Sequence, residues 1–241
     1  MMIKESKTIK QFSRFAHQYN TYNTIQSDVA KELVSKIPKK KYSSIIDIGC
    51  GSGEIYKNIE KNNFYFDNFI ALDSSKEMLA LHPSNVKVDK HQLDFDNIHS
   101  YSQLPHTKKN TLLISSSAIQ WSKNLDDLIR HLSHQSDKAY FAVFTSNTFK
   151  TLHQVANIKS PIYSEEILKE VIHKYYHASF QLYSYKLEFE IVRDMFRYIK
   201  KSGVSGGEKR LSYKETKNLM DSYPLEYLEF EVLFVEGTPL V

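Results

Sequence analysis

A glycine-rich loop directly behind a short apolar run is the feature that most constrains this sequence. Three of its seven glycines, Gly49, Gly51 and Gly53, lie in the stretch SIIDIGCGSGE, Ser44 to Glu54. Glycine lets the backbone adopt positive φ and approach a ligand without a Cβ atom in the way. A loop that concentrates glycine behind a buried strand therefore indicates a binding site lined by backbone.

Short apolar runs alternate with helical patterns along the first part of the chain. The runs typical of buried parallel strands are residues 45–49, 69–73, 111–117 and 139–146, with a shorter run at 86–89. Helical spacing is found at 54–61, 75–82 and 125–134, the last behind a cap residue at Asn124. This alternation predicts an α/β fold with a doubly wound, mostly parallel sheet and a ligand at the carboxyl ends of its strands.

The regions on either side of this alternation show a different pattern of predicted helices and strands. Helical patterns cover residues 1–42 and 147–178, followed by a strand at 178–190, helices at 191–203 and 213–223, and a closing strand at 226–237. No repeat or low-complexity linker interrupts them. We therefore predict one domain over 1–241, with an amino-terminal helical lid (1–42), a ligand-binding βα core (43–146) and lid insertions with closing strands (147–241).

Composition narrows the class of protein. The chain has 241 residues, of which 41% are hydrophobic, so it can bury one substantial core. Its one cysteine, its polar amino end and the lack of an apolar run near the length of a membrane span predict a soluble, cytoplasmic protein without disulfides. A net charge of +4 and the Lys39–Lys41 cluster permit an acidic partner, but a solvated surface is the favoured interpretation.

The spacing of the glycines distinguishes two kinds of ligand. A dinucleotide site needs G-x-G-x-x-G, with the pyrophosphate at the helix amino terminus. Here Glu54 stands where the third glycine should be, and an acid at that helix start opposes a bound phosphate. A cofactor with an amino-acid moiety and a ribose suits the loop better, and S-adenosylmethionine is such a molecule. The D-x-G-x-G-x-G pattern from Asp47 resembles the methyl-donor loop of class I methyltransferases.

Further residues follow the later strands where this donor needs them. Asp73 ends the second strand, where its carboxylate can accept hydrogen bonds from two ribose hydroxyls. Asp94 follows the third run and can receive the adenine amino group, with Leu93 or Phe95 over one ring face and Met78 over the other. Each has a plainer alternative: a helix cap for Asp73, a turn for Asp94, and a core position for Met78.

The sequence lacks the motifs that mark several classes of methyl acceptor. No two of the six prolines are adjacent, so the N-P-P-[YF] motif for exocyclic amines is missing. Cys50 sits in the glycine loop, which leaves no thiolate for addition to a pyrimidine ring. His173 and His177 share a helical face, as His131 and His134 nearly do, but no further ligands accompany them, so we predict no metal.

Segments outside the loop resemble one methyltransferase family, the malonyl-acyl-carrier-protein O-methyltransferases of biotin synthesis (the BioC family). The segment from Ser115 to Leu125, with its Gln120-Trp121 pair, is similar to the segment behind the fourth strand of that family. Phe12 to Tyr22 is similar to its amino-terminal helix, and Met195 to Gly203 to its M-R-x-[IL]-K-x-x-G stretch. The closing YPLEYLEFEVLFVEG resembles its last strand, so the resemblance spans nearly the whole chain.

The resemblance implies a Rossmann-like, seven-stranded class I methyltransferase fold with helical lid segments. It implies an enzyme that uses S-adenosylmethionine to esterify the free carboxylate of malonyl-acyl-carrier protein, an early step of biotin (pimeloyl) synthesis. Malonyl-coenzyme A is an alternative carrier, and neither nucleic acid nor membrane is expected as a partner. Two departures, HQSDKAY in place of a Pro-Gly-Gly turn and a loosely matching 147–178, leave the acceptor less determined than the chemistry.

The resemblance also implies roles for residues. A carboxylate is already ionised at pH 7, so catalysis needs positioning and no general base. Arg197 is expected to hold the malonyl carboxylate, although a surface arginine on a lid helix is the alternative. We assign to catalysis Arg197, Tyr19, Gln120 and Trp121. We assign to donor binding Arg14, Tyr22, Asp47, Gly49, Gly51, Gly53, Asp73, Ser74, Met78, Asp94, Phe95 and Ser115.

Basic residues near the lid fit an acidic carrier protein but do not decide the partner. Lys200, Lys201, Lys209 and Arg210 would steer acyl-carrier protein toward the site, and they fit RNA equally. Two other functions stay open: an O-methyltransferase of a small free carboxylic acid, and a donor-binding module without catalysis. The sequence leaves the oligomeric state undetermined.

Overall fold

The computed structural model describes residues 13, 22–97, 101, 108–201 and 211–241. These residues form a seven-stranded sheet of order β3-β2-β1-β4-β5-β7-β6. The strands from β3 to β5 pair in parallel, and β7 runs antiparallel to both β5 and β6. The predicted α/β class and the seven-stranded, mostly parallel sheet of a class I methyltransferase are thereby confirmed.

The strands are β1 (Lys41–Ile48), β2 (Tyr65–Asp73), β3 (Val88–Gln92), β4 (Thr111–Ser116), β5 (Lys138–Phe144), β6 (Tyr176–Glu188) and β7 (Tyr227–Pro239). The helices are α2 (Thr24–Ser35), α3 (Glu54–Lys61), α4 (Lys76–Leu81), η2 (Ile119–Trp121), α5 (Leu125–Leu132), α6 (Lys150–Val155), α7 (Glu165–His173), α8 (Val192–Lys201) and α9 (Tyr213–Ser222). Within the described part of the chain, no helix is long and apolar enough to span a membrane.

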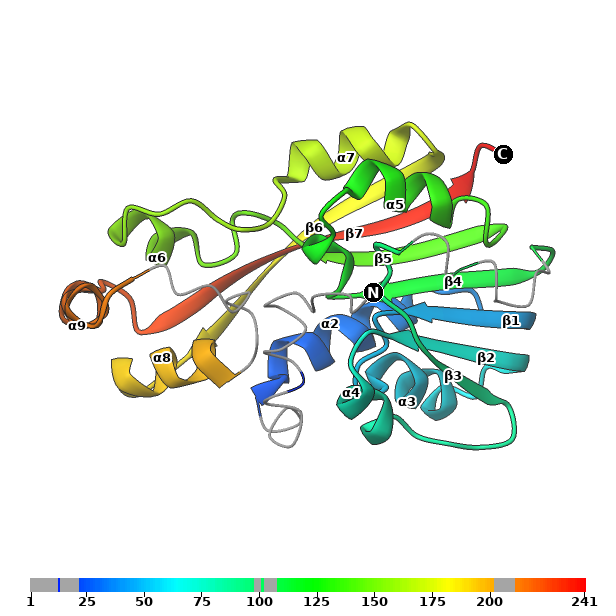
Figure 1. Ribbon diagram of the computed structural model, residues 1–241, viewed down its shortest axis with the longest axis horizontal. Coiled ribbons are helices and arrows are strands. Elements are labelled where there is room, and N and C mark those ends of the chain that lie inside the picture. The colour runs from blue at the N-terminus through cyan, green and yellow to red at the C-terminus, as the bar shows by residue number, and fades with distance from the viewer. Residues whose placement is uncertain (1–12, 14–21, 98–100, 102–107, 202–210) are drawn as a thin grey trace, which may run out of the picture.

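Two layers of helices cover the two faces of the sheet (Figure 1). Because successive residues of a strand point to opposite faces, Ile45 of β1 packs with α2 and α3, whereas Ile46 packs with α5 and α7. The same alternation places Asp47 on the face of Ile45. A carboxylate thus enters the otherwise apolar layer beneath α2 and α3.

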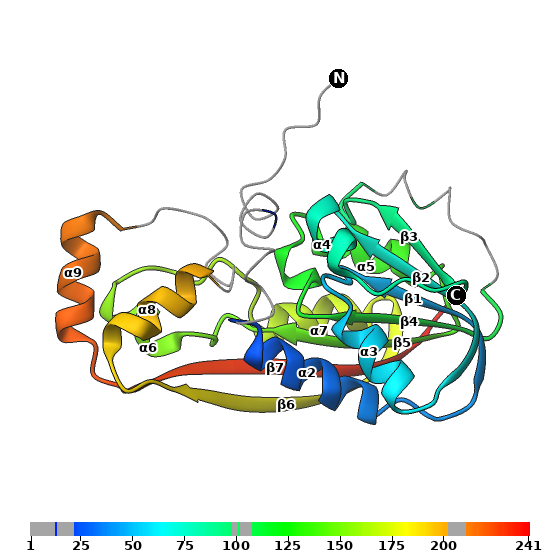
Figure 2. The ribbon, with the colours of Figure 1, turned by 90° about the horizontal axis from the view of Figure 1, so that it is seen from below.

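The hairpin of β6 and β7 extends beyond the other strands. Each of its strands has 13 residues and they pair along their whole length, from Tyr176 opposite Pro239 to Glu188 opposite Tyr227. The pairing of β7 with β5 stops at Val232, so the first part of β7 has no neighbour on that side within the sheet. Figures 1 and 2 show α6, α8 and α9 gathered around this extension, where the Tyr198 ring lies 6.3 Å from the Phe230 ring.

Several boundaries differ from the sequence predictions. β1 and β2 begin at Lys41 and Tyr65, earlier than their apolar runs, because the starts of the two strands pair with each other and bury Tyr42 and Phe66. The region predicted as helical over 147–178 contains two short helices, α6 and α7, and β6 already starts at Tyr176. Pro161 lies between these helices, and proline and its preceding residue both disfavour a continuous helix.

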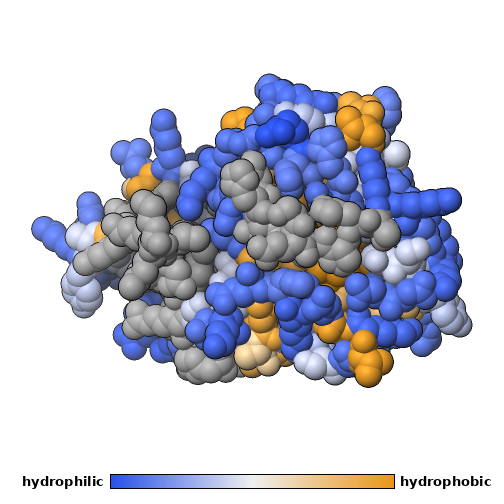
Figure 3. All heavy atoms as spheres, turned by 45° about the vertical axis from the view of Figure 1, so that its right-hand side comes forward, coloured by the Kyte–Doolittle hydropathy of each residue, from blue (hydrophilic) through white to orange (hydrophobic). Residues whose placement is uncertain are grey.

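On the face in Figure 3, hydrophilic residues predominate among the described residues, and hydrophobic atoms form smaller groups between them.

Candidate functional site

The glycine loop turns from β1 into α3 through three residues of positive φ. Gly49, Gly51 and Gly53 have φ values of +69°, +53° and +87°. A Cβ atom on Gly49 would lie 2.3 Å from the Cβ of Ala118, and one on Gly53 would lie 2.6 Å from Cδ of Pro83. Both positions therefore require glycine for packing as well as for conformation. At Gly51 the nearest atom to such a Cβ is the terminal methyl of Met78 at 3.4 Å, so conformation dominates there.

Asp73 ties the end of β2 to this loop. Its Oδ2 accepts a hydrogen bond from Gly51 N at 2.9 Å, and its Oδ1 accepts one from Ser75 N at 2.8 Å. Burial raises the pKa of Asp73, and hydrogen bonds from the backbone of Ser75, Gly51 and Ser74 oppose that rise. Because a carboxylate has about four acceptor positions, these three bonds leave about one for a ligand. The helix cap is Ser75, whose hydroxyl accepts from Met78 N at 3.2 Å, so Asp73 does not cap α4.

Asp47 is fully buried, and neither of its carboxylate oxygens has a hydrogen-bond partner among the described residues. Burial raises the pKa of Asp47 well above its usual range, and the negative charge of Asp73 adds to the rise. The side chain lines a cavity of about 40 Å³ together with Gly49 and Gly51. Since buried polar groups are almost always hydrogen-bonded, a bare carboxylate in this position points to a donor group that belongs in the cavity.

Three more acceptor oxygens without a partner in the described chain line the same cavity. They are Gln26 Oε1 from α2 and the hydroxyl oxygens of Ser116 and Ser117, where β4 ends. A group with several N–H donors and a positive charge, such as the ammonium of an amino acid, satisfies this set of acceptors. The residues present thus fit the amino-acid end of S-adenosylmethionine.

Sequence reasoning missed Gln26, Ser116 and Ser117. A signal existed for each. Gln26 is a polar residue on the buried face of α2, next to Ile25 and one turn before Ala30. The serines form part of a polar run directly behind a buried strand.

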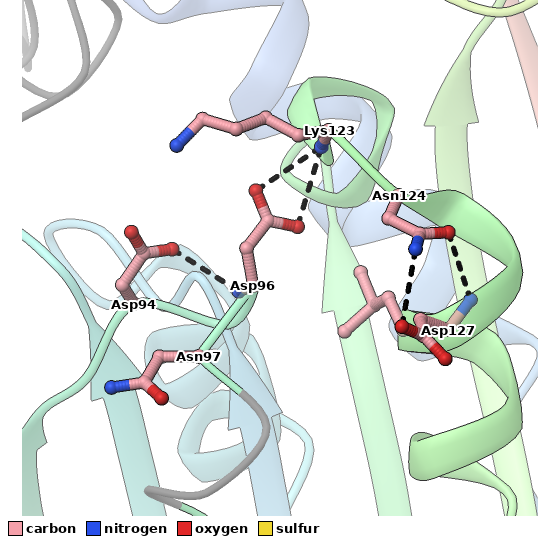
Figure 4. A pocket seen from close by; sticks show the side chains of 7 residues that line it. Asp94, Asp96, Asn97, Lys123, Asn124 and Asp127 are labelled. Carbon is pink, nitrogen blue, oxygen red and sulfur yellow. Dashed lines mark hydrogen bonds between the residues drawn. The ribbon is translucent and has the colours of Figure 1, made fainter.

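Asp94 lies at the carboxyl end of β3, beside a second cavity. Its Oδ1 accepts from Asp96 N at 3.1 Å, which is the turn that the sequence left as an alternative. Asp94 and Asp96 line a cavity of about 470 Å³ that lies opposite the start of α5 (Figure 4). Asp96 holds the two sides together, because it accepts from the Ser122 hydroxyl at 2.6 Å and from Lys123 N at 3.1 Å. Phe95 packs partly buried against the core cluster beneath α5.

The segment behind β4 supports the loop. Ser115 is fully buried and its hydroxyl donates to Ile48 O at 2.8 Å, so it joins β4 to β1 and does not line the small cavity. Gln120 is also buried and donates from Nε2 to Ser117 O at 2.7 Å. Trp121 ends the short helix η2 half-buried. Ser74 is half-buried next to Asp73, and its carbonyl accepts from Gln92 Nε2 at 3.1 Å.

Helix α8 presents Arg197 on the surface. The Arg197 side chain is 52% exposed and forms an ion pair with Asp194 one turn earlier. The opposite face of α8 is buried at Met195 and Tyr198. Arg197 does not line either of the two cavities described above.

The contact between α8 and the donor side is made by another residue. Lys201 Nζ donates to the hydroxyl of Tyr22 at 3.2 Å and lies 5.0 Å from the centre of that ring. Tyr22 precedes α2, which carries Gln26 into the small cavity one turn later. Lys201 is thus engaged within the protein, whereas Lys200 is exposed.

Other predicted residues lie outside the described part of the chain: Arg14, Tyr19, Lys209 and Arg210. Ser13 is described, and its hydroxyl lies 2.8 Å from the hydroxyl of Ser75, next to the donor loop. Among the described side chains, no group of three or more His, Cys, Asp or Glu is arranged to hold a metal ion.

Known proteins resemble this chain in sequence. Residues 46–135 match the family model described as "Methyltransferase domain". The chain is 28% identical over 234 residues to the malonyl-[acyl-carrier protein] O-methyltransferase of Bacillus cytotoxicus, a match that covers 86% of this chain and 79% of that protein. It is 27% identical over 246 residues to malonyl-[acyl-carrier protein] O-methyltransferase 2 of Ilyobacter polytropus, with 94% and 92% covered.

Other matches are shorter or more distant. With the malonyl-[acyl-carrier protein] O-methyltransferase of Priestia megaterium, the 28% identity covers 63% of this chain and 56% of the relative. Among solved structures, the YcgJ protein of Bacillus subtilis superposes with a TM-score of 0.63 at 11% identity, over 88% of this chain and 98% of YcgJ. At that identity the structural likeness shows the fold alone.

Proposed function

Because this chain is a class I S-adenosylmethionine-dependent methyltransferase, we propose that it esterifies the free carboxylate of malonyl-acyl-carrier protein, an early step of biotin synthesis. One observation carries the proposal. The match to a relative of that name extends over 94% of this chain, and therefore through β6 and α8, far beyond the matched domain at 46–135. An acceptor is recognised by the parts outside the donor-binding core, so similarity in those parts bears on the acceptor.

The core residues would hold the donor. Asp73 would accept from a ribose hydroxyl at the acceptor position that its three backbone bonds leave, and Asp47 lies in the cavity that fits the amino-acid end. The positive-φ loop lines that cavity with backbone, and Met78 lies beside it. When bound, S-adenosylmethionine supplies a methyl group whose bond to the sulfonium sulfur breaks as the bond to the acceptor oxygen forms, with the electron pair left on sulfur.

The remaining assignments belong to the same proposal. Asp94 and Phe95 would serve the adenine, with Ser74 and Ser115 supporting the strand ends around it. Arg14, Tyr19 and Tyr22 would close over the site from the amino-terminal lid (1–42), and the insertions of 147–241 would form the other wall around the 43–146 core.

Positioning is the task left to the acceptor side. The malonyl carboxylate is ionised at neutral pH and needs no base, so a residue that orients one oxygen toward the methyl group suffices. Arg197 can do this with a charge-assisted contact, provided that the substrate replaces Asp194 as its partner. That exchange costs little, because an exposed ion pair of this kind contributes about 0–1 kcal/mol. Gln120 and Trp121, at the end of the catalytic strand, would shape the passage between the two substrates.

The product leaves because its charge is gone. A methyl ester no longer pairs with a guanidinium, so Arg197 holds the substrate more tightly than the product. The same contact gives selectivity, since an acetyl thioester would leave the guanidinium without a partner. Lys200 is exposed on the same helix and offers a positive charge to an acidic carrier protein.

A panel of acceptors tests the proposal. Transfer of labelled methyl from S-adenosylmethionine is measured on malonyl-acyl-carrier protein, acetyl-acyl-carrier protein, malonyl-coenzyme A and free malonate. We expect base-labile label on the malonyl carrier protein and none on the acetyl form. Label on free malonate or another small acid would move the function to a small-acid O-methyltransferase. Binding of the donor without label on any acceptor would favour a non-catalytic module.

A further inference from the structure

Gln26 is a buried polar residue to which the proposed function assigns no specific contact. It is 6% exposed, its Oε1 has no partner among the described residues, and it lines the small cavity with Asp47 and Ser117. The two observations are independent: one concerns the hydrogen bonds of the amide, the other the space into which it faces. An unsatisfied buried amide oxygen is costly, so its position calls for a specific ligand group.

The helix that carries Gln26 is held firmly against the donor loop. The buried face of α2 includes Ile25 and Val29, which join the core cluster of that sheet face. On the next residue of the helix, the Ser27 hydroxyl donates to Glu54 Oε2 at 3.0 Å, and Glu54 is the first residue of α3. Since both ends of this contact are fixed, Gln26 cannot leave the cavity without moving α2.

The chemistry of the cavity selects an amide at this position. A second carboxylate beside Asp47 would add a buried negative charge, which burial and like-charge repulsion both disfavour. An amide oxygen adds an acceptor without that charge. Asp47 supplies one negative charge and Gln26, Ser116 and Ser117 supply neutral acceptors, a set that matches one cation with several N–H donors.

We infer that Gln26 Oε1 accepts a hydrogen bond from the α-ammonium group of the bound methyl donor. This inference rests on the proposed donor, and it extends the donor site to α2, which lies outside the matched domain of residues 46–135. It also gives the amino-terminal helix a direct part in donor binding, beyond covering the sheet.

Three probes separate this inference from other roles of Gln26. Isothermal titration calorimetry on the full chain gives the affinity for S-adenosylhomocysteine, for its analogue without the amino group, and for its analogue without the carboxylate. Gln26→Leu removes the acceptor, and Gln26→Met keeps a flexible side chain of similar length if the leucine variant folds poorly. Ser27→Ala removes the hydrogen bond from α2 to Glu54, which also lines the cavity, and leaves Gln26 in place.

We expect Gln26→Leu to weaken S-adenosylhomocysteine and the decarboxylated analogue about tenfold each, the typical effect of removing a hydrogen bond to a charged group. The deaminated analogue should bind the variant and the wild type alike. Ser27→Ala should change all three affinities by a common factor. A loss confined to the two carboxylate-bearing probes would show that the amide serves the carboxylate, and equal losses on all three would show a purely structural role.

Failure of the inference and failure of the proposed donor give different results. If S-adenosylhomocysteine binds wild type and Gln26→Leu equally well, Gln26 has no part in donor binding, but the assignment of S-adenosylmethionine as the donor is retained. If S-adenosylhomocysteine does not bind the wild-type chain, both are overturned.

Discussion

The donor-loop end and the α8 end of this molecule hold their polar side chains in opposite ways. At the donor end, acceptor oxygens from Asp47 and Gln26 are buried around a cavity of about 40 Å³, behind a loop held by Asp73. At the far end of the β6–β7 hairpin, Arg197 is half exposed and already paired with Asp194. Under the proposed function, donor binding would depend on fixed, buried geometry, whereas acceptor binding would depend on the exchange of partners at the surface.

The largest effect that would sharpen this comparison is expected at Gly49. Gly49→Ala places a Cβ atom 2.3 Å from the Cβ of Ala118 in a residue with φ of +69°, so we expect a loss of about 2–4 kcal/mol in the free energy of unfolding, together with donor affinity. Urea denaturation measures the loss. Gly51→Ala is the matched control, with a similar φ but only a 3.4 Å contact, and should cost about 1–2 kcal/mol. Equal losses would show that packing against Ala118 has no part.

The buried carboxylate of Asp47 should make stability depend on pH. Burial, with the charge of Asp73, raises the pKa of Asp47 in the folded chain, so the folded state keeps a proton that the unfolded state loses. Stability is then fully present below the usual carboxyl pKa of about 4 and falls as pH rises through the raised value, by at most about 1.4 kcal/mol per pH unit.

Asp47→Asn should remove this contribution. We expect the variant to be more stable than the wild type at pH 7 and to show a flatter profile from pH 5 to 7.5, measured by urea denaturation without donor. Its affinity for S-adenosylhomocysteine should fall about tenfold, because the ammonium group loses its counter-charge. Identical pH slopes in the two proteins would contradict a buried Asp47 that keeps its proton without donor and ionises beside the ammonium group of the donor.

A smaller effect on activity is expected at the contact between Lys201 of α8 and Tyr22, which precedes α2. Lys201→Met removes the contact to the Tyr22 hydroxyl and ring while keeping the aliphatic stem, so we expect kcat/KM to fall about threefold to tenfold. The control is Lys200→Met, which removes an exposed charge next to it in the helix. If both variants lose the same activity, the Tyr22 contact does not couple α8 to the donor side.

The smallest effect concerns the surface alone. Lys200→Glu should raise the KM for malonyl-acyl-carrier protein about twofold to threefold at low salt, since rim charges act mainly on association. The KM for malonyl-coenzyme A, measured in parallel, should change less because it lacks the acidic protein surface. An effect that persists unchanged at high salt would rule out steering.

The sequence predicted the donor end better than the lid. The alternation of apolar runs and helical patterns is a short-range signal, and the α/β sheet that it predicted is confirmed. The donor-binding roles of the glycine loop and Asp73 stay predictions. Gln26, Ser116 and Ser117 were missed because they become neighbours only when β4 pairs in the sheet and α2 packs against β4 and β5. The ion pair of Arg197 with Asp194 is local and could have been read from their spacing on one helix. The length of the β6–β7 hairpin could not be predicted from the sequence, because the length of a strand depends on the strand that pairs with it.

One measurement tests the division between the two ends most directly. In Arg197→Ala, methyl transfer to malonyl-acyl-carrier protein and the affinity for S-adenosylhomocysteine are measured on the same preparation, beside Arg193→Ala as an exposed arginine of the same helix. We predict that Arg197→Ala lowers kcat/KM about a hundredfold, the cost of a lost charge-assisted contact of about 3 kcal/mol, and leaves donor affinity unchanged, while Arg193→Ala changes neither. Undiminished transfer, or a loss of donor affinity as large as the loss of transfer, would contradict the account.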